Sequence, residues 1–515
     1  MTRRPLRAFP SNANKSTPFA LPPPVGGWNA RDALATMPAT DAERLDNWFP
    51  DTTWVSPRAG SLTYTPVLNG DVKTAIQYAS GSTVKLLVAS TGALVAISTS
   101  GTAGAATVAT GYGSDQWQGV NFGAGGGNYL IMANGTDLVQ AYNGASASAQ
   151  AFTVADGSLT STFTNVNEFQ QRLYFTKSNS LKFYYVKTAN AISGSVESFD
   201  LSGIMSSGGE LRAMGTWTRD SGAGMDDLAV FISSQGQAAV YQGTDPTSAT
   251  TWALVGVYSL PAPLGYRCVE KFGGDLVVLT GQGVLPMSAI VGGPLQQGSY
   301  ITDKIRKAFA AEVAYYRNTW GWQVKYFAEV NWLLVNIPSS PTTTQFVMNT
   351  NTGAWCRFLG FEALCWESFR AMPMLGVTGK VIQANYGTND DGADIQIDAK
   401  QAATTCDQPG RQKKWNLFRP HLATNGDLPI TVGVNIDFSD VPPTSVPTPI
   451  PVNYPYWDQA LWDTQFWGDS AQIVSSWYSA GGYGTYGAVR LTGAVNTETI
   501  QWFGTDIVTE AGGLL

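Results

Sequence analysis

From about residue 70 to residue 388, hydrophobic and polar positions repeat one pattern: a short apolar strand, a tight turn and a second short apolar strand. Most of the turns contain Asn-Gly, Gln-Gly or Thr-Gly, which supply the positive φ that two-residue hairpin turns require. The turns centre on Gly92, Gly135, Asn179, Gly236, Gly283, Gly353 and Gly379, at intervals of 43, 44, 57, 47, 70 and 26 residues.

A hairpin period that drifts around 40 to 50 residues is typical of a β-propeller, in which each repeat forms one four-stranded blade. A single blade cannot bury both of its faces, whereas a ring of blades leaves only short exposed edges. The pattern therefore predicts an all-β chain with a β-propeller of six or seven blades over residues 70–388. An array of β-sandwiches is the alternative that the pattern leaves open.

The longest interval between turns contains a segment with helical rather than strand periodicity, residues 301–317. Its apolar residues Ile305, Phe309 and Val313 recur at helical spacing, and Thr302 stands where a capping residue is expected. We expect this segment to be a helix inserted between two blades.

The pattern changes after Gly392, where strictly alternating segments predict antiparallel strands. They indicate a C-terminal β-sandwich or barrel domain over residues 389–515. Within it, the prolines of residues 440–470 remove the donors that a strand ladder needs, so this segment leaves the sheet and returns. A loop of this length in a compact domain is usually functional.

The N-terminal part has no strand period of its own. Residues 1–24 are polar and end in three consecutive prolines, which predicts an extended arm. Residues 25–69 are rich in turn and cap signals and are predicted to form a packed connector. Within the connector, Asp41 is expected to cap a short helix that runs through Leu45.

Composition narrows the classes of function. The 515 residues carry a net charge of −7, and only 13% are charged while 12% are aromatic. An acidic chain is a poor candidate for gripping nucleic acid electrostatically, although nucleic acid can pass such a surface without being held. The N-terminus lacks the apolar core of a signal peptide, and no apolar run approaches the ~20 residues of a membrane span.

Catalytic signatures are scarce in the sequence. The single histidine, His421, lies in a strand-like segment and is interpreted as structural. The four cysteines lack metal-ligand spacing and are expected to be buried. The acidic segment 387–398 has only part of a Ca²⁺-loop pattern and is interpreted as a solvated turn between domains. We expect no enzyme activity, cofactor or metal, although a carboxylate pair that meets only in space would leave no motif.

The tryptophans of the 440–470 segment have an unusual spacing. Trp457, Trp462 and Trp467 recur every five residues, which fits neither a helix nor a strand. Either they fold back on their own domain, or they are buried against a neighbouring subunit, where tryptophan is strongly enriched; stacking on carbohydrate is a third interpretation. Together with Trp28 and Trp48, they are the predicted interface residues.

Several stretches together resemble the tail nozzle proteins (tail tubular protein B, or tail hub) of short-tailed bacteriophages. The resemblance rests on "GGWNARDALATMPATDAERLDNWFPD", the following "VSPRAG", the hairpin array and the ending "FGTDIVTEAGG", and it covers nearly the whole chain. It implies a structural virion protein without catalytic residues. Such proteins form a hexameric ring below the adaptor that continues the DNA ejection channel.

The resemblance also implies partners and a location. A nozzle protein contacts five further copies of itself, the adaptor, and fibres, spikes or a plug, and double-stranded DNA passes through its lumen without specific binding. It is assembled in the cytoplasm of the host bacterium and resides in the virion tail. Low charge and many aromatics suit permanent interfaces in a head-to-tail ring. The proline-rich residues 440–456 depart from the family pattern.

Two alternatives of another class stay open at this point. One is a propeller-based tail protein that binds or cleaves host glycans, and the other is a monomeric propeller that binds some protein. A nozzle protein is expected to form a stable ring without hydrolysis. A glycan-directed protein is expected to bind sugar and to carry a surface carboxylate cluster.

Overall fold

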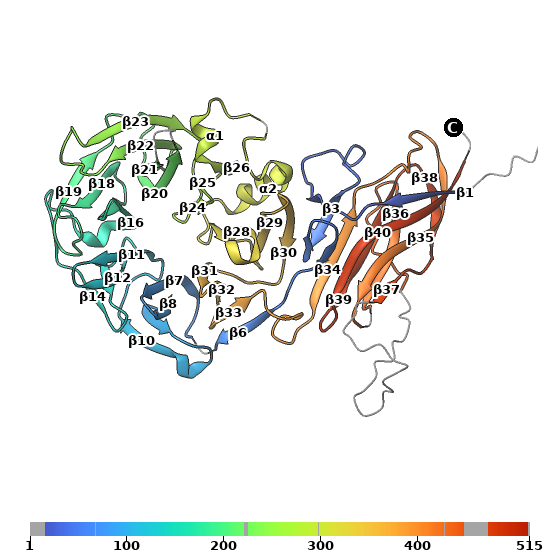
Figure 1. Cartoon of the computed structure of the whole chain (residues 1–515), viewed down its shortest axis with the longest axis horizontal. Coiled ribbons are helices and arrows are strands. Elements are labelled where there is room, and N and C mark those ends of the chain that lie inside the picture. The colour runs from blue at the N-terminus through green and yellow to red at the C-terminus, as the bar shows by residue number, and fades with distance from the viewer. Residues whose placement is uncertain are drawn as a thin grey trace, which may run out of the picture. The chain divides into compact units, whose positions relative to one another are not determined.

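The computed structural model divides the chain into two compact units (Figure 1). The propeller unit is Arg58–Ile395, and the sandwich unit combines Met1–Pro57 with Gln396–Leu515. The structure describes residues 16–66, 68–220, 225–296, 298–426, 428–446 and 472–512.

The propeller unit contains successive groups of antiparallel strands. The first three groups are β7 (Val72–Ser80), β8 (Thr83–Ser90), β9 (Ala93–Ile97) and β10 (Ala105–Thr110); β11 (Gln118–Ala124), β12 (Gly127–Ala133), β13 (Gln140–Tyr142) and β14 (Ala147–Ala149); and β16 (Phe163–Phe169), β17 (Arg172–Lys177), β18 (Lys182–Val186) and β19 (Gly194–Asp200), joined by β15 (Phe152–Val154).

The next groups are β20 (Leu211–Asp220), β21 (Met225–Ser233), β22 (Gln237–Gly243) and β23 (Trp252–Ser259); β24 (Val269–Phe272), β25 (Asp275–Thr280) and β26 (Gly283–Pro286); β27 (Gln323–Phe327), β28 (Trp332–Ile337), β29 (Thr344–Asn349) and β30 (Ala354–Phe358); and β31 (Cys365–Phe369), β32 (Met372–Val377) and β33 (Lys380–Ala384) with β6 (Ser61–Thr65).

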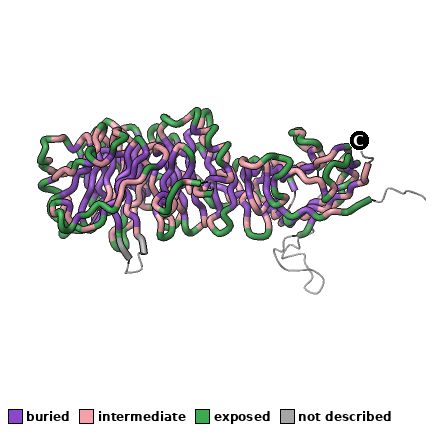
Figure 2. Tube along the Cα trace, turned by 90° about the horizontal axis from the view of Figure 1, so that it is seen from above, coloured by how far each residue is buried: buried purple, intermediate pink, exposed green. Residues whose placement is uncertain are grey.

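These groups form the blades of a β-propeller, as predicted. The first strand of each group contacts the first strand of the next, and β31 contacts β7, which closes the ring. Six groups are small sheets in their own right, and β27 to β30 complete the ring as a seventh group. Buried positions occupy the middle of the strands and most turns are exposed (Figure 2).

All the predicted turn residues lie in hairpins and have positive φ. Six of these turns join the second and third strands of a group. Gly353 is the exception, because it joins the third and fourth strands, β29 and β30. The interval of 70 residues before Gly353 and the short one after it therefore reflect a different hairpin of the blade as well as an insertion.

The inserted helix is confirmed as α2 (Arg306–Tyr316), which follows a 3₁₀ turn at Asp303–Ile305. Phe309 and Val313 are buried, as its periodicity predicted. The predicted cap is wrong, since the Thr302 hydroxyl forms no cap bond and accepts the backbone N–H of Val284 at 3.1 Å. The remaining helical pieces are short: α1 (Met287–Val291) and 3₁₀ turns at Thr102–Gly104, Thr160–Thr162 and Ala328–Val330.

Apolar side chains packed between neighbouring blades form most of the propeller core. Between the groups that start with β16 and β20, the rings of Phe183 and Phe231 stack with centroids 4.2 Å apart. Trp252 belongs to the same cluster and stacks on Tyr241 at 5.2 Å. The ring of blades thus buries faces that a single blade would leave in water.

A strand from the start of the unit closes the propeller. β6 pairs with β33, which lies more than 300 residues later in the chain. Next to β6, the Arg58 guanidinium binds the Asp390 carboxylate at 2.5 and 3.0 Å, and the Ser61 hydroxyl donates to the same carboxylate. Gly60 allows this approach, since a Cβ there would lie 1.9 Å from the backbone oxygen of Asn389.

The sandwich unit has two sheets. The first contains β37 (Gln472–Val474) and β38 (Tyr478–Gly484) beside β35 (Lys413–Thr424), then β40 (Ile500–Ala511), β5 (Val55–Pro57) and β4 (Trp48–Pro50), with β1 (Ser16–Leu21) paired to β40. The second contains β2 (Gly27–Trp28), β3 (Asp41–Asp46), β34 (Ile395–Gln401), β39 (Gly487–Val495) and β36 (Ile430–Ile436).

The two sheets meet at Trp415 on β35, whose ring lies against Gly487 of β39. Residues expected to form an arm and a connector supply β1 to β5 of this unit. The predicted helix from Asp41 to Leu45 is wrong: these residues form strand β3, parallel to β2 and antiparallel to β34. Pairing on both sides overrides the weak local helix preference of a six-residue segment.

Candidate functional site

The predicted interface tryptophans fall into two sets. Trp457, Trp462 and Trp467 lie outside the described residues. Trp28 is 6% exposed, and Trp48 is fully buried, with its ring edge-to-face on Trp502 at a centroid distance of 6.2 Å. A fully buried indole has no surface left for a second subunit, so Trp48 belongs to the core of the sandwich unit instead.

The N-terminal stretch "WNARD" forms a hydrogen-bonded loop between β2 and β3. Asn29 donates from its side-chain amide to the carboxylates of Asp32 and Asp41, both at 2.8 Å. Its side-chain oxygen accepts the backbone N–H groups of Arg31 and Asp32 at 3.0 Å. These bonds use all the strong valences of a buried asparagine and fix the loop. The motif therefore has a structural explanation.

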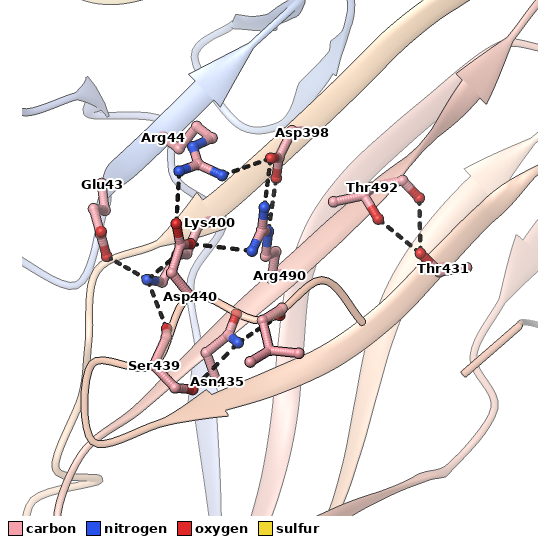
Figure 3. A network of polar contacts seen from close by, with 11 residues as sticks. Glu43, Arg44, Asp398, Lys400, Thr431, Asn435, Ser439, Asp440, Arg490 and Thr492 are labelled. Atoms are coloured by element: carbon pink, nitrogen blue, oxygen red, sulfur yellow. Dashed lines mark hydrogen bonds and ion pairs between the residues drawn. The ribbon is translucent and has the colours of Figure 1, made fainter. Parts of the chain in front are cut away.

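An ion network holds the start of the predicted 440–470 excursion (Figure 3). Arg490 on β39 binds both carboxylate oxygens of Asp398 on β34 at 2.7 and 2.9 Å, and Asp440 at 3.1 Å. Arg44 on β3 binds the same two carboxylates at 2.8 and 3.0 Å. The two arginines thus clamp Asp440 to two neighbouring strands of the second sheet.

Lys400 extends this network beneath Asp440 (Figure 3). Its side chain is 1% exposed, and its ammonium lies 2.9 Å from Glu43, 3.5 Å from Asp440 and 2.9 Å from the carbonyl oxygen of Ser439. Burial raises the pKa of Asp440, but Arg44, Lys400 and Arg490 outweigh burial and hold that pKa below its usual value. Asp440 is therefore ionised at neutral pH.

The excursion returns beside His421 of β35. The His421 Nε2 atom lies 3.0 Å from Asp506 of β40, and its Nδ1 atom lies 3.1 Å from the hydroxyl of Ser475. Arg419 binds the same Asp506 oxygen at 2.5 and 3.1 Å. Serine hydrolases use the opposite ring nitrogens, with the serine on Nε2. These contacts give His421 a structural role, joining β35, β40 and the residues after β37.

The propeller axis holds a small polar cavity of about 180 Å³. Each blade contributes to it through its first strand, with Thr74, Gln118, Asn165, Met214, Glu270, Lys325 and Glu367 among the lining residues. Arg267, just before β24, reaches across the axis to the Thr74 hydroxyl and the Gln323 side chain, both at 3.3 Å, and to the carbonyl oxygen of Lys73. It joins blades that are not neighbours and fills the centre of the ring.

Charged residues pair inside this cavity. The Lys325 ammonium lies 3.1 Å from Glu367 and 3.9 Å from Glu270. Burial raises the pKa of Glu270, and Glu367 adds to the rise against the opposing pull of Lys325. Burial alone would lower the pKa of Lys325, but the two carboxylates more than offset it and raise that pKa. The ammonium therefore stays charged and links three successive blades.

Sequence reasoning missed this axial cluster, although a signal for it exists. Glu270, Lys325 and Glu367 each stand in the middle of an otherwise largely apolar first strand: "VEKF", "QVKYF" and "CWESF". A charge at the same place in successive repeats indicates a position on the propeller axis. The pattern was hidden because the hairpin turns, rather than the first strands, defined the repeat.

The remaining sequence candidates have structural roles. All four cysteines are free and buried, as expected, and burial raises the pKa of Cys365 to about 11 and that of Cys268 to about 12. In the acidic segment 387–398, Asp390 binds Arg58, and the carboxylate of Asp391 accepts the hydroxyl of Thr63 at 2.6 Å. Among the described residues, no group of three acidic, cysteine or histidine side chains forms a metal site.

Comparison with known proteins returns structural similarity alone. No family model matches the chain, and no curated protein sequence does. Similar solved structures include the extracellular domain of the BT4673 one component system from B. thetaiotaomicron, with 9% identity, a TM-score of 0.40 and coverage of 73% of this chain and 54% of that one. The chain thus spans about half the length of that protein.

Two further similar structures are Sqt1 of Saccharomyces cerevisiae and BBS1N in complex with ARL6DN. Sqt1 has 11% identity and a TM-score of 0.36, over 63% of this chain and 98% of that one. BBS1N has 14% identity and a TM-score of 0.29, over 45% and 74%. In the described part of the chain, no helix is both long and apolar enough to cross a membrane.

Proposed function

We propose that this chain is a structural tail protein that forms the nozzle ring of a short-tailed bacteriophage. The observation that carries the proposal is where the stretches with the family resemblance lie. The N-terminal stretch supplies β2 to β5, and the ending "FGTDIVTEAGG" lies mostly in β40. In the sandwich unit, β40 pairs with β5 at Trp502 and Val55, so these distant stretches form one module.

The propeller axis bears on where DNA would run in such a ring. A cavity of about 180 Å³, crossed by Arg267, has room for a few water molecules but not for a nucleic acid strand. In the proposed hexamer, DNA therefore passes between copies of the chain and not through a propeller. The net charge of −7 suits a lumen that does not hold the phosphate backbone.

The ends of the 440–470 excursion support its proposed role as an intersubunit contact. Asp440 is clamped by Arg44 and Arg490, and Gln472–Val474 pair with the end of β35. Firm anchoring lowers the entropy lost when a projecting loop is ordered in an interface. The indoles of Trp457, Trp462 and Trp467 are the proposed anchors in the next copy of the chain.

The experiment that tests the proposal is electron microscopy of purified tails and of the isolated chain without imposed symmetry. We expect a sixfold ring around a central lumen. Replacing Trp457, Trp462 and Trp467 together with alanine is expected to abolish the ring while the monomer keeps its unfolding temperature. Tyr483→Ala, which removes a 72% exposed aromatic side chain from β38, is the matched control and should still assemble. A peripheral trimer, or absence from the tail, would refute the proposal.

A further inference from the structure

The outer face of the first sheet in the sandwich unit carries an unusual group of side chains. Along β35 and β40, residues alternate between the core and the outside, with Phe418, Leu422 and Ile507 buried. The group on the outside, with neighbouring loop residues, is here named the aromatic–ionic face and consists of Trp54, Arg419, His421, Trp477, Phe503 and Asp506.

The centre of the aromatic–ionic face is a fixed polar cluster. Arg419 and His421, two residues apart on β35, both bind the Oδ2 atom of Asp506, which lies opposite Arg419 in the strand register. Within the described residues, the Oδ1 atom of Asp506 forms no hydrogen bond and stays available as an acceptor. The three side chains are between 26% and 32% exposed, so the cluster is held in place but open to solvent.

Aromatic rings flank this cluster. The Arg419 guanidinium lies 4.6 Å from the centroid of the Trp477 ring, and Trp477 is 44% exposed. Phe503, on β40 near Asp506, is 38% exposed and meets Trp54 edge-to-face at 6.1 Å. Each exposed ring leaves apolar surface in water at roughly 25 cal/mol per Å², which a stacked ligand would recover.

The chemistry of this face selects among ligand classes. Protein interfaces are depleted of charged residues at their centre, whereas this face has an ion pair there. Nucleic acid requires an excess of cations, but Asp506 neutralises Arg419. A sugar ring presents an apolar C–H face to an aromatic side chain and hydroxyls to carboxylate, guanidinium and imidazole groups, which donate and accept in fixed directions. We propose that the aromatic–ionic face binds an uncharged saccharide.

In this site, Trp477 and Phe503 stack on sugar rings, and Asp506 accepts a hydroxyl through Oδ1. Arg419 and His421 act mainly as positioning residues, because they hold the carboxylate and the Trp477 ring. The site lies entirely in the sandwich unit, so it does not rest on the proposed nozzle ring. It is also distinct from the propeller-based glycan site considered from the sequence.

The test is a glycan microarray of bacterial surface saccharides probed with the full chain, followed by titration calorimetry with the saccharide that binds best. Trp477→Ala and Asp506→Asn are each expected to weaken binding at least tenfold. The control Tyr483→Ala, a comparably exposed aromatic side chain on β38, should stay within about twofold of the unsubstituted chain. Thermal unfolding identifies a variant that fails to fold, and the isosteric Asp506→Asn then decides.

Three results would overturn the assignment: no saccharide bound by the unsubstituted chain, binding that neither substitution weakens, or binding restricted to charged saccharides and lost at high salt. If a tail protein were instead found to bind this face, and Trp477→Ala abolished that contact while saccharides were ignored, the face would be a protein interface and the proposal would fail.

Discussion

The two units are built in different ways. In the propeller unit, almost every strand pairs with a strand that is next to it in the sequence, and only β6, at the end of the ring, comes from far away. In the sandwich unit, β40 at the C-terminus pairs with β35, with β5 and with β1, whose residue Ser16 faces Glu510. The first unit is mostly local, and the second depends on contacts between the ends of the chain.

The difference extends to where each unit places its buried charges. The propeller unit concentrates them on its axis, where Lys325 links carboxylates from neighbouring blades. The sandwich unit uses them to fasten a loop, as Arg490 and Arg44 clamp Asp440. Charges thus join repeated elements in one unit and fix an irregular segment in the other. Substitutions at these and at core positions can separate the two cases.

The largest effect is expected from Trp502→Ala in the sandwich unit. Trp502 is fully buried, packs on Trp48 and donates from its indole to the carbonyl oxygen of Gly504 and the hydroxyl of Thr505, both at 3.1 Å. We expect the free energy of unfolding to fall by about 3–5 kcal/mol. Hydrogen exchange measured by mass spectrometry should show faster exchange in β35, β40 and β1 before any change in the blades.

The control for Trp502→Ala is Tyr483→Ala, which removes an exposed aromatic side chain from the same sheet and should change the unfolding free energy by less than about 0.5 kcal/mol. Equal acceleration of exchange in both units after Trp502→Ala would mean that the chain unfolds as one body, and the comparison between a local and a non-local unit would lose its energetic meaning.

A smaller effect is expected from Arg58→Ala at the closure of the propeller. Its side chain is 1% exposed and binds Asp390 at 2.5 Å, so the substitution leaves a carboxylate without its main partner. We expect a loss of about 3 kcal/mol. Exchange should rise first in β6 and β33, since the other blades keep their sequential pairings. Urea unfolding and hydrogen exchange measure both quantities.

Lys187→Ala is the matched control in the same unit. Lys187 pairs with Glu197 at 3.2 Å but is 58% exposed, so its loss should matter by less than about 1 kcal/mol. If Arg58→Ala and Lys187→Ala were equally mild, the Arg58–Asp390 pair would not be what secures β6.

How much of this the sequence predicts follows the same division. Turn residues such as Gly92 and Gly236 predict their hairpins, because a two-residue turn needs positive φ whatever surrounds it. Helix α2 is also predictable from its own periodicity. Strand β3 is not, because Asp41 and Leu45 become strand residues only through pairing with β34, about 350 residues later in the chain. Local patterns carry no record of such partners.

The candidate sites divide in the same way. The burial of Trp48 and the contact between Arg419, His421 and Asp506 depend on the register between β35 and β40, which no local motif encodes. The axial charges were in principle readable, because Glu270 and Lys325 occupy similar places in successive repeats. Sequence therefore locates residues that repeat, whereas sites assembled from both ends of the chain require the fold.

The smallest effect contrasts how two carboxylates respond to pH. The folded-state pKa of Asp506 is lowered: burial raises it, but bonds from Arg419 and His421 outweigh burial. Its contribution to stability is therefore present above its ordinary pKa of 3.8 and lost as the pH falls through the lowered value. The folded-state pKa of Glu270 is raised from 4.5, so its contribution is fully present below 4.5 and lost as the pH rises through the raised value.

Opposite trends should follow when unfolding free energies are measured from about pH 7 down to about pH 3. The stability difference between the unsubstituted chain and Asp506→Asn, of about 0.2–1 kcal/mol at neutral pH, should shrink on acidification. The difference between the unsubstituted chain and Glu270→Gln should grow over the same interval, because protonation removes the penalty for burying a charge. Parallel trends would show that the axial carboxylate is solvated like the surface one, and that the propeller axis is not the dry, charge-linked centre that its contacts indicate.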